Sequence, residues 1–145
     1  MYDSYLLAVD RFDSAQAALE FTVSLFSGTA NEVRIVHVRE LQAVRGGPVL
    51  IETSEDAHAV VDHAVAFLGE HGVRASGRVV KGLETQVAAI IVQEAEDCRC
   101  QAIIMGSRRL RGLGRLAGQG VRSRVLRLTA LPVMTAPPSR EQIAS

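Results

Sequence analysis

Short apolar segments alternate with segments whose apolar residues recur at helical spacing along almost the whole chain. Continuous apolar runs of this length are typical of strands buried on both faces of a sheet, and the spacing between them predicts amphipathic helices. The predicted strands are residues 5–9, 33–38, 73–80, 101–105 and 133–135. We therefore predict an α/β fold: a single-domain, three-layer sandwich with helices on both faces of a five-stranded parallel sheet.

The predicted helices begin and end at residues that favour helix termini. Their start signals are Asp13 or Ser14, Thr53 or Ser54, and Glu84-Thr85, and their stop signals are Gly28 and Gly72. A fourth helix is expected near residues 120–130, and an irregular loop is expected over residues 40–52. Ligands of open parallel sheets bind beyond the carboxyl ends of the strands, where the strand order reverses. We therefore expect a ligand crevice where the first, second and fourth strands end.

Composition limits the size, location and partners of the protein. The 145 residues, 48% of them apolar, are enough for one domain with a substantial core. We predict this domain over residues 1–137, followed by a flexible tail over residues 138–145. The formal net charge is zero, so no overall positive field attracts nucleic acid or an anionic membrane. Because we find no signal-peptide pattern and no apolar stretch of membrane-spanning length, we predict a cytoplasmic protein.

Positive charge is nevertheless concentrated after the fourth predicted strand. Seven arginines lie between residues 108 and 127, whereas the only lysine is Lys81. Guanidinium groups bind phosphate in a bidentate manner, and the N-terminus of a helix favours an anion. The loop that begins with Gly106-Ser107 is therefore a candidate phosphate-binding loop. Aromatic residues make up 4% of the chain and none lies among these arginines, so a nucleic-acid surface with stacked bases is not predicted.

Several segments together resemble the universal stress protein family over almost the full length of the chain. They are Leu7-Ala8-Val9-Asp10, Val36-His37-Val38, Ile104-Met105-Gly106-Ser107-Arg108, and Val125-Leu126-Arg127 with Leu131-Pro132-Val133. The combination and its spacing carry the likeness, rather than any one segment. The resemblance implies strand order 3-2-1-4-5, a homodimer formed through the last strand, and ATP or AMP as the ligand. It also implies that Asp10 lies near the adenine and ribose.

The glycine loop departs from the pattern of the ATP-binding members of that family. Those members carry Gly, two residues, Gly, nine residues, and then Gly-Ser or Gly-Thr. Counted from Gly106, the later positions fall on Arg109, Gln119 and Gly120. Arg109 brings a side chain to a position where glycine allows close approach of the backbone to a phosphate, and Gly120 lacks the hydroxyl that would donate to it. Arg108, Arg109 and Arg122 can supply other contacts to an anion.

Other patterns carry less information. Residues 112–117 match G-x-G-x-x-A, but no acidic residue lies about 20 positions further on, so we treat the match as coincidence. The pair Cys98 and Cys100 can bind metal or form a redox pair, but without further cysteines or suitably spaced histidines we expect two reduced thiols at a helix end. We expect His37 to be a hydrogen-bonded core residue, and the other histidines, His58, His63 and His71, to lie on the surface.

Two functions of different kinds remain open. The first is a stress-response binding module that holds a nucleotide or another phosphate-bearing ligand in the crevice. Its predicted ligand-binding residues are Ala8, Val9, Asp10, Val38, Met105, Gly106, Arg108, Arg109, Gly120 and Val121. The second is a protein of the same kind that binds no nucleotide and acts through dimerisation and protein contacts.

We do not predict an enzyme, because no nucleophile–base pair, metal cluster or carboxylate pair is recognisable in the sequence. Slow ATP hydrolysis is a third alternative, and it would require a divalent metal near Asp10.

Overall fold

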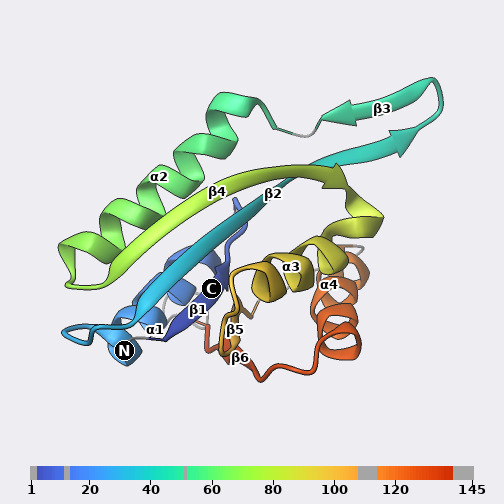
Figure 1. Cartoon of the computed structure of the whole chain (residues 1–145). Helices are drawn as coiled ribbons and strands as arrows, with labels where there is room; N and C mark the ends of the chain where they lie inside the picture. The colour runs from blue at the N-terminus through green and yellow to red at the C-terminus, as the bar shows by residue number, and fades with distance from the viewer. Residues whose placement is uncertain (1–2, 12–13, 51, 108–113, 139–145) are drawn as a thin grey trace.

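The computed structural model describes residues 3–11, 14–50, 52–107 and 114–138. Strands and helices alternate along the chain, except that β2 and β3 follow one another, as Figure 1 shows. The elements are β1 (Ser4–Ala8), α1 (Ser14–Phe26), β2 (Glu32–Val44), β3 (Gly47–Leu50), α2 (Ser54–Glu70), β4 (Arg74–Leu83), the 3-10 turn η1 (Glu84–Gln86), α3 (Val87–Asp97), β5 (Ile103–Gly106), α4 (Gly114–Leu128) and β6 (Val133–Ala136).

Five of the strands form a parallel sheet in the order β4-β2-β1-β5-β6. Numbered among the parallel strands alone, this is the predicted order 3-2-1-4-5, which is confirmed. Strand β1 lies in the centre and pairs with β2 on one edge and with β5 on the other. The order reverses at β1, so the crevice beyond its carboxyl end is the position where folds of this type bind ligands.

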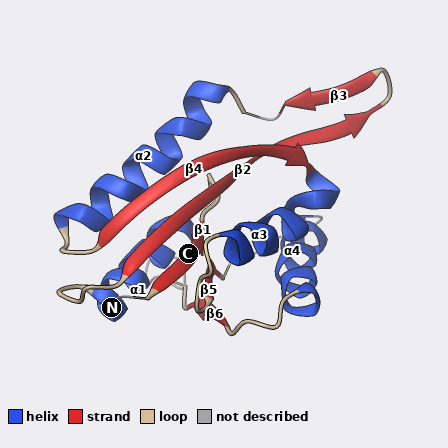
Figure 2. Ribbon diagram, viewed as in Figure 1, coloured by secondary structure: helices blue, strands red, loops and turns tan. Residues whose placement is uncertain are grey.

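Helices cover both faces of the sheet, as the ribbon in Figure 2 shows. Leu6 packs into a cluster with residues of α3 and α4, whereas the next residue, Leu7, packs into a second cluster with residues of α1 and α2. Neighbouring side chains of a strand point to opposite faces, so one central strand supplies both cores. Both leucines are almost fully buried, and each contributes about 1.5–3 kcal/mol of hydrophobic stabilisation.

The helix termini agree with the signals in the sequence at several positions. The hydroxyl of Thr53 accepts a hydrogen bond from the backbone N–H of Asp56 and caps α2. Gly28 and Gly72, which follow α1 and α2, have φ values of +78° and +79°, the left-handed conformation that glycine adopts without strain. Helix α3 begins only at Val87, because residues 84–86 form the 3-10 turn.

The prediction of an irregular loop over residues 40–52 is wrong. Strand β2 continues to Val44, and β3 returns antiparallel to it as a hairpin that projects beyond the other strands in Figure 1. Gly46 and Gly47 have φ values of +104° and +124°, a backbone conformation that residues with a side chain rarely adopt. Glycines at these two positions therefore permit a tight hairpin turn. Leu41 pairs with β4 and with β3, so these strands flank β2 on opposite edges.

The boundaries near the predicted phosphate loop also differ from expectation. Strand β5 spans Ile103–Gly106 rather than residues 101–105, and α4 begins at Gly114, earlier than the predicted start near residue 120. Within the described residues, no helix combines the length and apolarity needed to cross a membrane.

Candidate functional site

The carboxyl ends of β1, β2 and β5 meet in the centre of the sheet. Ala8 is paired with Val36 of β2 on one side and with Met105 of β5 on the other. The N–H of Val9 donates to the carbonyl oxygen of Val36 at 3.0 Å, which extends the pairing one residue past the end of β1. Four predicted ligand residues, Ala8, Val9, Met105 and Gly106, therefore lie at adjoining strand ends, and Val38 follows two residues beyond Val36.

Asp10 is held at the start of α1. The hydroxyl of Ser14, the first residue of α1, lies 3.1 Å and 3.0 Å from the two carboxylate oxygens of Asp10 and donates to them. Ser14 is 4% exposed, so its side chain is fixed by this contact and by its surroundings. The carboxylate of Asp10 thus lies at a helix N-terminus, where the helix dipole favours negative charge. Of the two predicted caps of α1, Asp13 lies outside the described residues.

Gly106 lies so close to α1 that a larger residue does not fit without a shift. A Cβ atom at this position would lie 3.0 Å from the carbonyl oxygen of Ser14 and 3.4 Å from its Cβ. The absence of a side chain at Gly106 therefore lets β5 approach the start of α1 and brings Asp10 and the β5 end together.

Ser107 carries a buried hydroxyl group at the start of the predicted phosphate loop. Its Oγ is buried, and among the described residues no group forms a hydrogen bond with it. Buried polar atoms without partners are rare in native proteins because desolvation is not compensated. A ligand oxygen or a water molecule at this position would satisfy the hydroxyl, so the orphaned Oγ fits a phosphate-bearing ligand.

Gly120 and Val121 lie within α4 and not at its N-terminus. Because α4 begins at Gly114, these residues follow the first turn, whose four N–H groups lack partners within the helix. An anion bound by backbone amides of α4 would therefore meet residues near 114–117 rather than Gly120. A Cβ at Gly120 would lie more than 4 Å from every atom of the described residues outside its chain neighbours and the adjoining helix backbone. Arg108 and Arg109 lie outside the described residues.

His37 and Glu52 form a buried pair that the sequence patterns did not reveal. Nδ1 of His37 lies 2.9 Å from the carbonyl oxygen of Val9, and Nε2 lies 2.5 Å from Oε1 of Glu52. Since a carbonyl oxygen only accepts, Nδ1 donates, and a proton lies between Nε2 and the carboxylate. His37 is 3% exposed, which confirms the prediction of a hydrogen-bonded core histidine. The pair joins the end of β1 to the segment before α2.

A cavity of about 350 Å³ lies at the carboxyl end of β1, on the face covered by α1 and α2. Its lining residues are Val9, Asp10, Arg11, Ala15, Gln16, Leu19, Ala59, Val60, His63 and Ala64. Only Val9 and Asp10 belong to the predicted ligand set. The cavity therefore adjoins the end of β1 on the side of α1 and α2, and Met105 and Gly106 are not among its lining residues.

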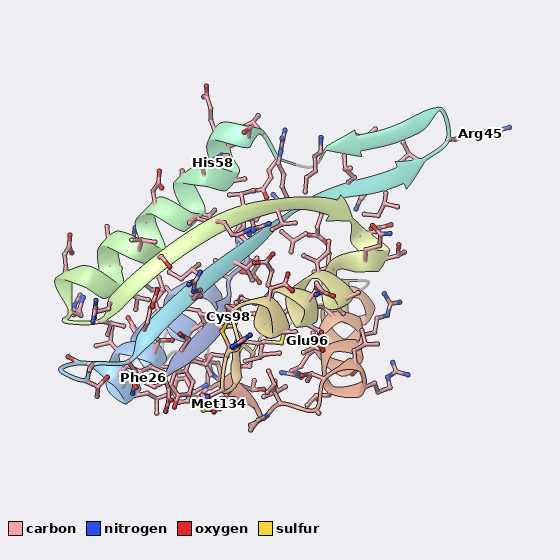
Figure 3. The ribbon with its side chains drawn as sticks, viewed as in Figure 1. Phe26, Arg45, His58, Glu96, Cys98 and Met134 are labelled. Carbon is pink, nitrogen blue, oxygen red and sulfur yellow. A yellow bond between two sulfur atoms is a disulfide. The ribbon has the colours of Figure 1, made fainter. Side chains whose placement is uncertain are left out.

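The prediction of two reduced thiols is wrong, because Cys98 and Cys100 form a disulfide. His58, His63 and His71 are exposed as predicted, and Figure 3 shows His58 on α2 at the outside of the molecule. Among the described residues, no group of histidine, cysteine, aspartate and glutamate side chains is arranged to hold a metal ion.

Comparison with known proteins gives one consistent result. The sequence model of the Universal stress protein family matches residues 1–137. No curated protein sequence matches the chain.

Solved structures of universal stress proteins share the fold. One from Burkholderia pseudomallei is 24% identical, with a TM-score of 0.71, and the match covers 94% of this chain and 97% of that one. One from Archaeoglobus fulgidus in complex with dAMP is 20% identical, with a TM-score of 0.69 and coverage of 94% and 98%. One from Arabidopsis thaliana with AMP bound is 20% identical, with a TM-score of 0.64 and coverage of 97% and 94%.

Proposed function

Since this chain belongs to the universal stress protein family, we propose that it is a stress-response binding module for an adenine nucleotide, held in the crevice between β1 and β5. The observation that carries the proposal is the convergence of Ala8, Met105 and Ser107 at adjoining strand ends, with the Oγ of Ser107 buried and unpaired among the described residues. The relatives with dAMP and AMP support an adenine nucleotide as the ligand.

Different residues are proposed to bind the ribose and the phosphate of the nucleotide. Asp10, at the start of α1, offers carboxylate oxygens that accept hydrogen bonds from ribose hydroxyls. Ser107 and the first-turn amides of α4 offer donors to phosphate. Directly after Ser107 the sequence continues with Arg108 and Arg109, a residue type that binds phosphate through charge-assisted hydrogen bonds.

Isothermal titration of the nucleotide-free protein with AMP, ATP, cyclic AMP and adenosine tests this proposal. We expect measurable binding of at least one nucleotide and weaker binding of adenosine, because adenosine lacks a phosphate group for Ser107 and the first-turn amides of α4 to bind. Absence of heat with every adenine nucleotide at millimolar concentration would overturn it.

A second candidate function is protein binding without a nucleotide. The position of Gly120 favours it, because this residue lies within α4 and its amide is past the first turn. In that case the purified protein carries no nucleotide, whereas an adenine nucleotide released on denaturation and identified by mass spectrometry would count against it. Slow hydrolysis of bound ATP is tested separately, by phosphate release above the buffer background in the presence of Mg²⁺.

Dimerisation through β6 belongs to both proposals. Among the described strands, β6 pairs only with β5, so its outer edge offers backbone groups to a second copy of the chain.

A further inference from the structure

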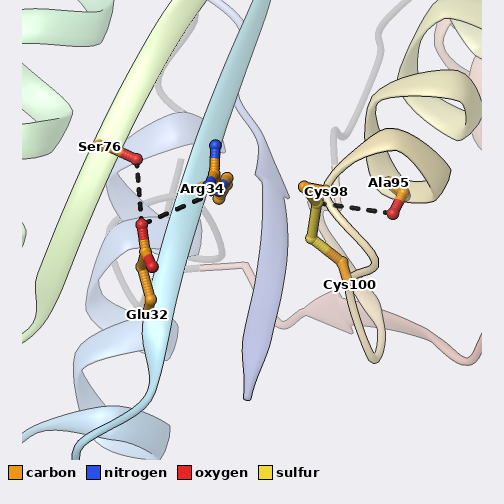
Figure 4. The surroundings of a disulfide bond; sticks show 6 residues. All are labelled: Glu32, Arg34, Ser76, Ala95, Cys98 and Cys100. Atoms are coloured by element: carbon orange, nitrogen blue, oxygen red, sulfur yellow. Dashed lines mark hydrogen bonds and ion pairs between the residues drawn. A yellow bond between two sulfur atoms is a disulfide. The ribbon is translucent and has the colours of Figure 1, made fainter. Parts of the chain in front are cut away.

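The disulfide between Cys98 and Cys100 closes a ring with only Arg99 between the two cysteines. Figure 4 shows it at the end of α3, with Sγ of Cys98 directed to the carbonyl oxygen of Ala95 at 3.5 Å. The N–H of the next residue, Gln101, donates to the carbonyl oxygen of Ser4, at the start of β1. The disulfide therefore lies at the amino-terminal edge of the sheet, opposite the proposed nucleotide crevice, and its chemistry is independent of the nucleotide.

The backbone of this turn is a Schellman motif, the usual way to end a helix. The N–H of Cys100 donates to the carbonyl oxygen of Ala95 at 2.9 Å, and the N–H of Arg99 donates to that of Glu96 at 3.1 Å. Arg99 occupies the left-handed position with φ of +55°, where glycine is most common. These hydrogen bonds hold the turn without any help from the sulfur atoms.

The same turn brings the two cysteines into bonding range. Their Cα atoms lie 5.4 Å apart, within the range that disulfides require. Because backbone hydrogen bonds set this separation, the bond can open and close with little movement of the chain. A ring with one intervening residue also removes little entropy from the unfolded chain, so the disulfide is a weak structural crosslink.

The two cysteine residues differ in exposure. Cys98 is half-buried, whereas Cys100 is 4% exposed and lies within the core beside α3. An incoming thiolate therefore reaches the Sγ of Cys98 first.

From these observations we propose that Cys98 and Cys100 form a reversible thiol–disulfide exchange site whose partner is a dithiol. One thiolate of the dithiol attacks Sγ of Cys98, a mixed disulfide forms, and Sγ of Cys100 leaves and takes up a proton. The second thiol of the partner then attacks the partner's other sulfur, which is bonded to Sγ of Cys98 in the mixed disulfide. This step releases Cys98 as a thiol. Two electrons and two protons pass to this protein, and the partner becomes a disulfide.

The test is reduction and reoxidation of the full chain under native conditions. Millimolar dithiothreitol should reduce both cysteines together, as seen by maleimide labelling and intact mass, while the circular dichroism spectrum stays native. Oxidised glutathione should then restore the disulfide. A disulfide that resists dithiothreitol until the protein unfolds would overturn the proposal, as would two thiols that stay unpaired in oxidised glutathione.

Single-cysteine variants provide a matched pair for the order of attack. In Cys100→Ser the remaining Cys98 should react with oxidised glutathione and with maleimide about tenfold or more faster than Cys100 does in Cys98→Ser, because a buried thiol is inaccessible to both reagents. Equal rates in the two folded variants would contradict entry at Cys98.

Arg99→Gly tests whether the backbone alone forms the turn. If the turn exists without the disulfide, this change should raise the melting temperature of the reduced and oxidised forms alike. A gain confined to the oxidised form would show that the bond, and not the backbone, creates the turn.

Discussion

Nε2 of His37 and Oε1 of Glu52 lie 2.5 Å apart, with both side chains more than nine-tenths buried. The same imidazole donates through Nδ1 to the carbonyl oxygen of Val9, directly before Asp10. The backbone carbonyl of Glu52 accepts a further hydrogen bond from Nε of Arg39 at 3.1 Å. One buried histidine thus connects the end of β1, strand β2 and the segment that precedes α2, and it fixes the backbone from which Asp10 projects.

Removing the carboxylate from this pair should destabilise the protein strongly. We expect Glu52→Ala to lower the free energy of unfolding by about 3–5 kcal/mol, as when one partner of a buried ion pair is lost. Glu52→Gln should cost clearly less, because its amide can donate to the neutral Nε2 of His37. Urea unfolding followed by circular dichroism measures both.

A double variant separates the interaction from the loss of packing. His37→Leu combined with Glu52→Leu should cost less than the sum of the two single changes, because neither polar group is then left unpaired. If the two single changes were simply additive, the side chains would not be coupled.

Two glycines provide a matched pair for the packing near the crevice. Gly106→Ala should destabilise the protein by about 1–3 kcal/mol, since the added Cβ presses on the backbone of Ser14. Gly120→Ala should instead stabilise it by about 0.5–1 kcal/mol, because the position is helical and open and alanine favours helix. The melting temperature should fall in Gly106→Ala and rise in Gly120→Ala. A lower melting temperature in Gly120→Ala would contradict the place of this residue within α4.

Ser107→Ala distinguishes a ligand contact from a structural one. The hydroxyl has no partner among the described residues, so its removal should leave the melting temperature unchanged or slightly higher. Nucleotide binding should weaken by about 0.5–1.5 kcal/mol, a change of about two- to twelvefold in Kd. Ser24→Ala, on the exposed side of α1, is the control and should leave the Kd for the nucleotide unchanged. An unchanged Kd in Ser107→Ala would exclude this hydroxyl from the site.

A positive charge at the outer strand tests dimerisation. Thr135 is exposed on β6, and Thr135→Lys should hinder pairing of β6 with a second copy of the chain, as lysine does on exposed edge strands. Light scattering coupled to gel filtration should give a dimer for the original chain and a monomer for this variant. Ser123→Lys, on the exposed surface of α4, should remain dimeric. A monomeric original chain would argue against the dimer altogether.

Local sequence patterns were sufficient for most of the fold. The continuous apolar run that contains Leu6 and Leu7 predicted a strand buried on both faces, and both residues supply the two cores. The glycines at the ends of α1 and α2 predicted the helix ends, because only a left-handed residue closes those turns cheaply. Strand order followed from the family resemblance, since periodicity carries no information on which strands are neighbours.

The sequence alone therefore determined what depends on neighbours along the chain: the alternation of strands and helices and the two-sided burial of the sheet. Only the tertiary structure decided what depends on groups brought together by folding. The β2–β3 hairpin, the His37–Glu52 pair and the contact of Gly106 with Ser14 are of this kind. The disulfide between Cys98 and Cys100 was also visible only in the tertiary structure. The spacing of the two cysteines in the sequence does not predict that the helix ends in a turn that brings their sulfur atoms together.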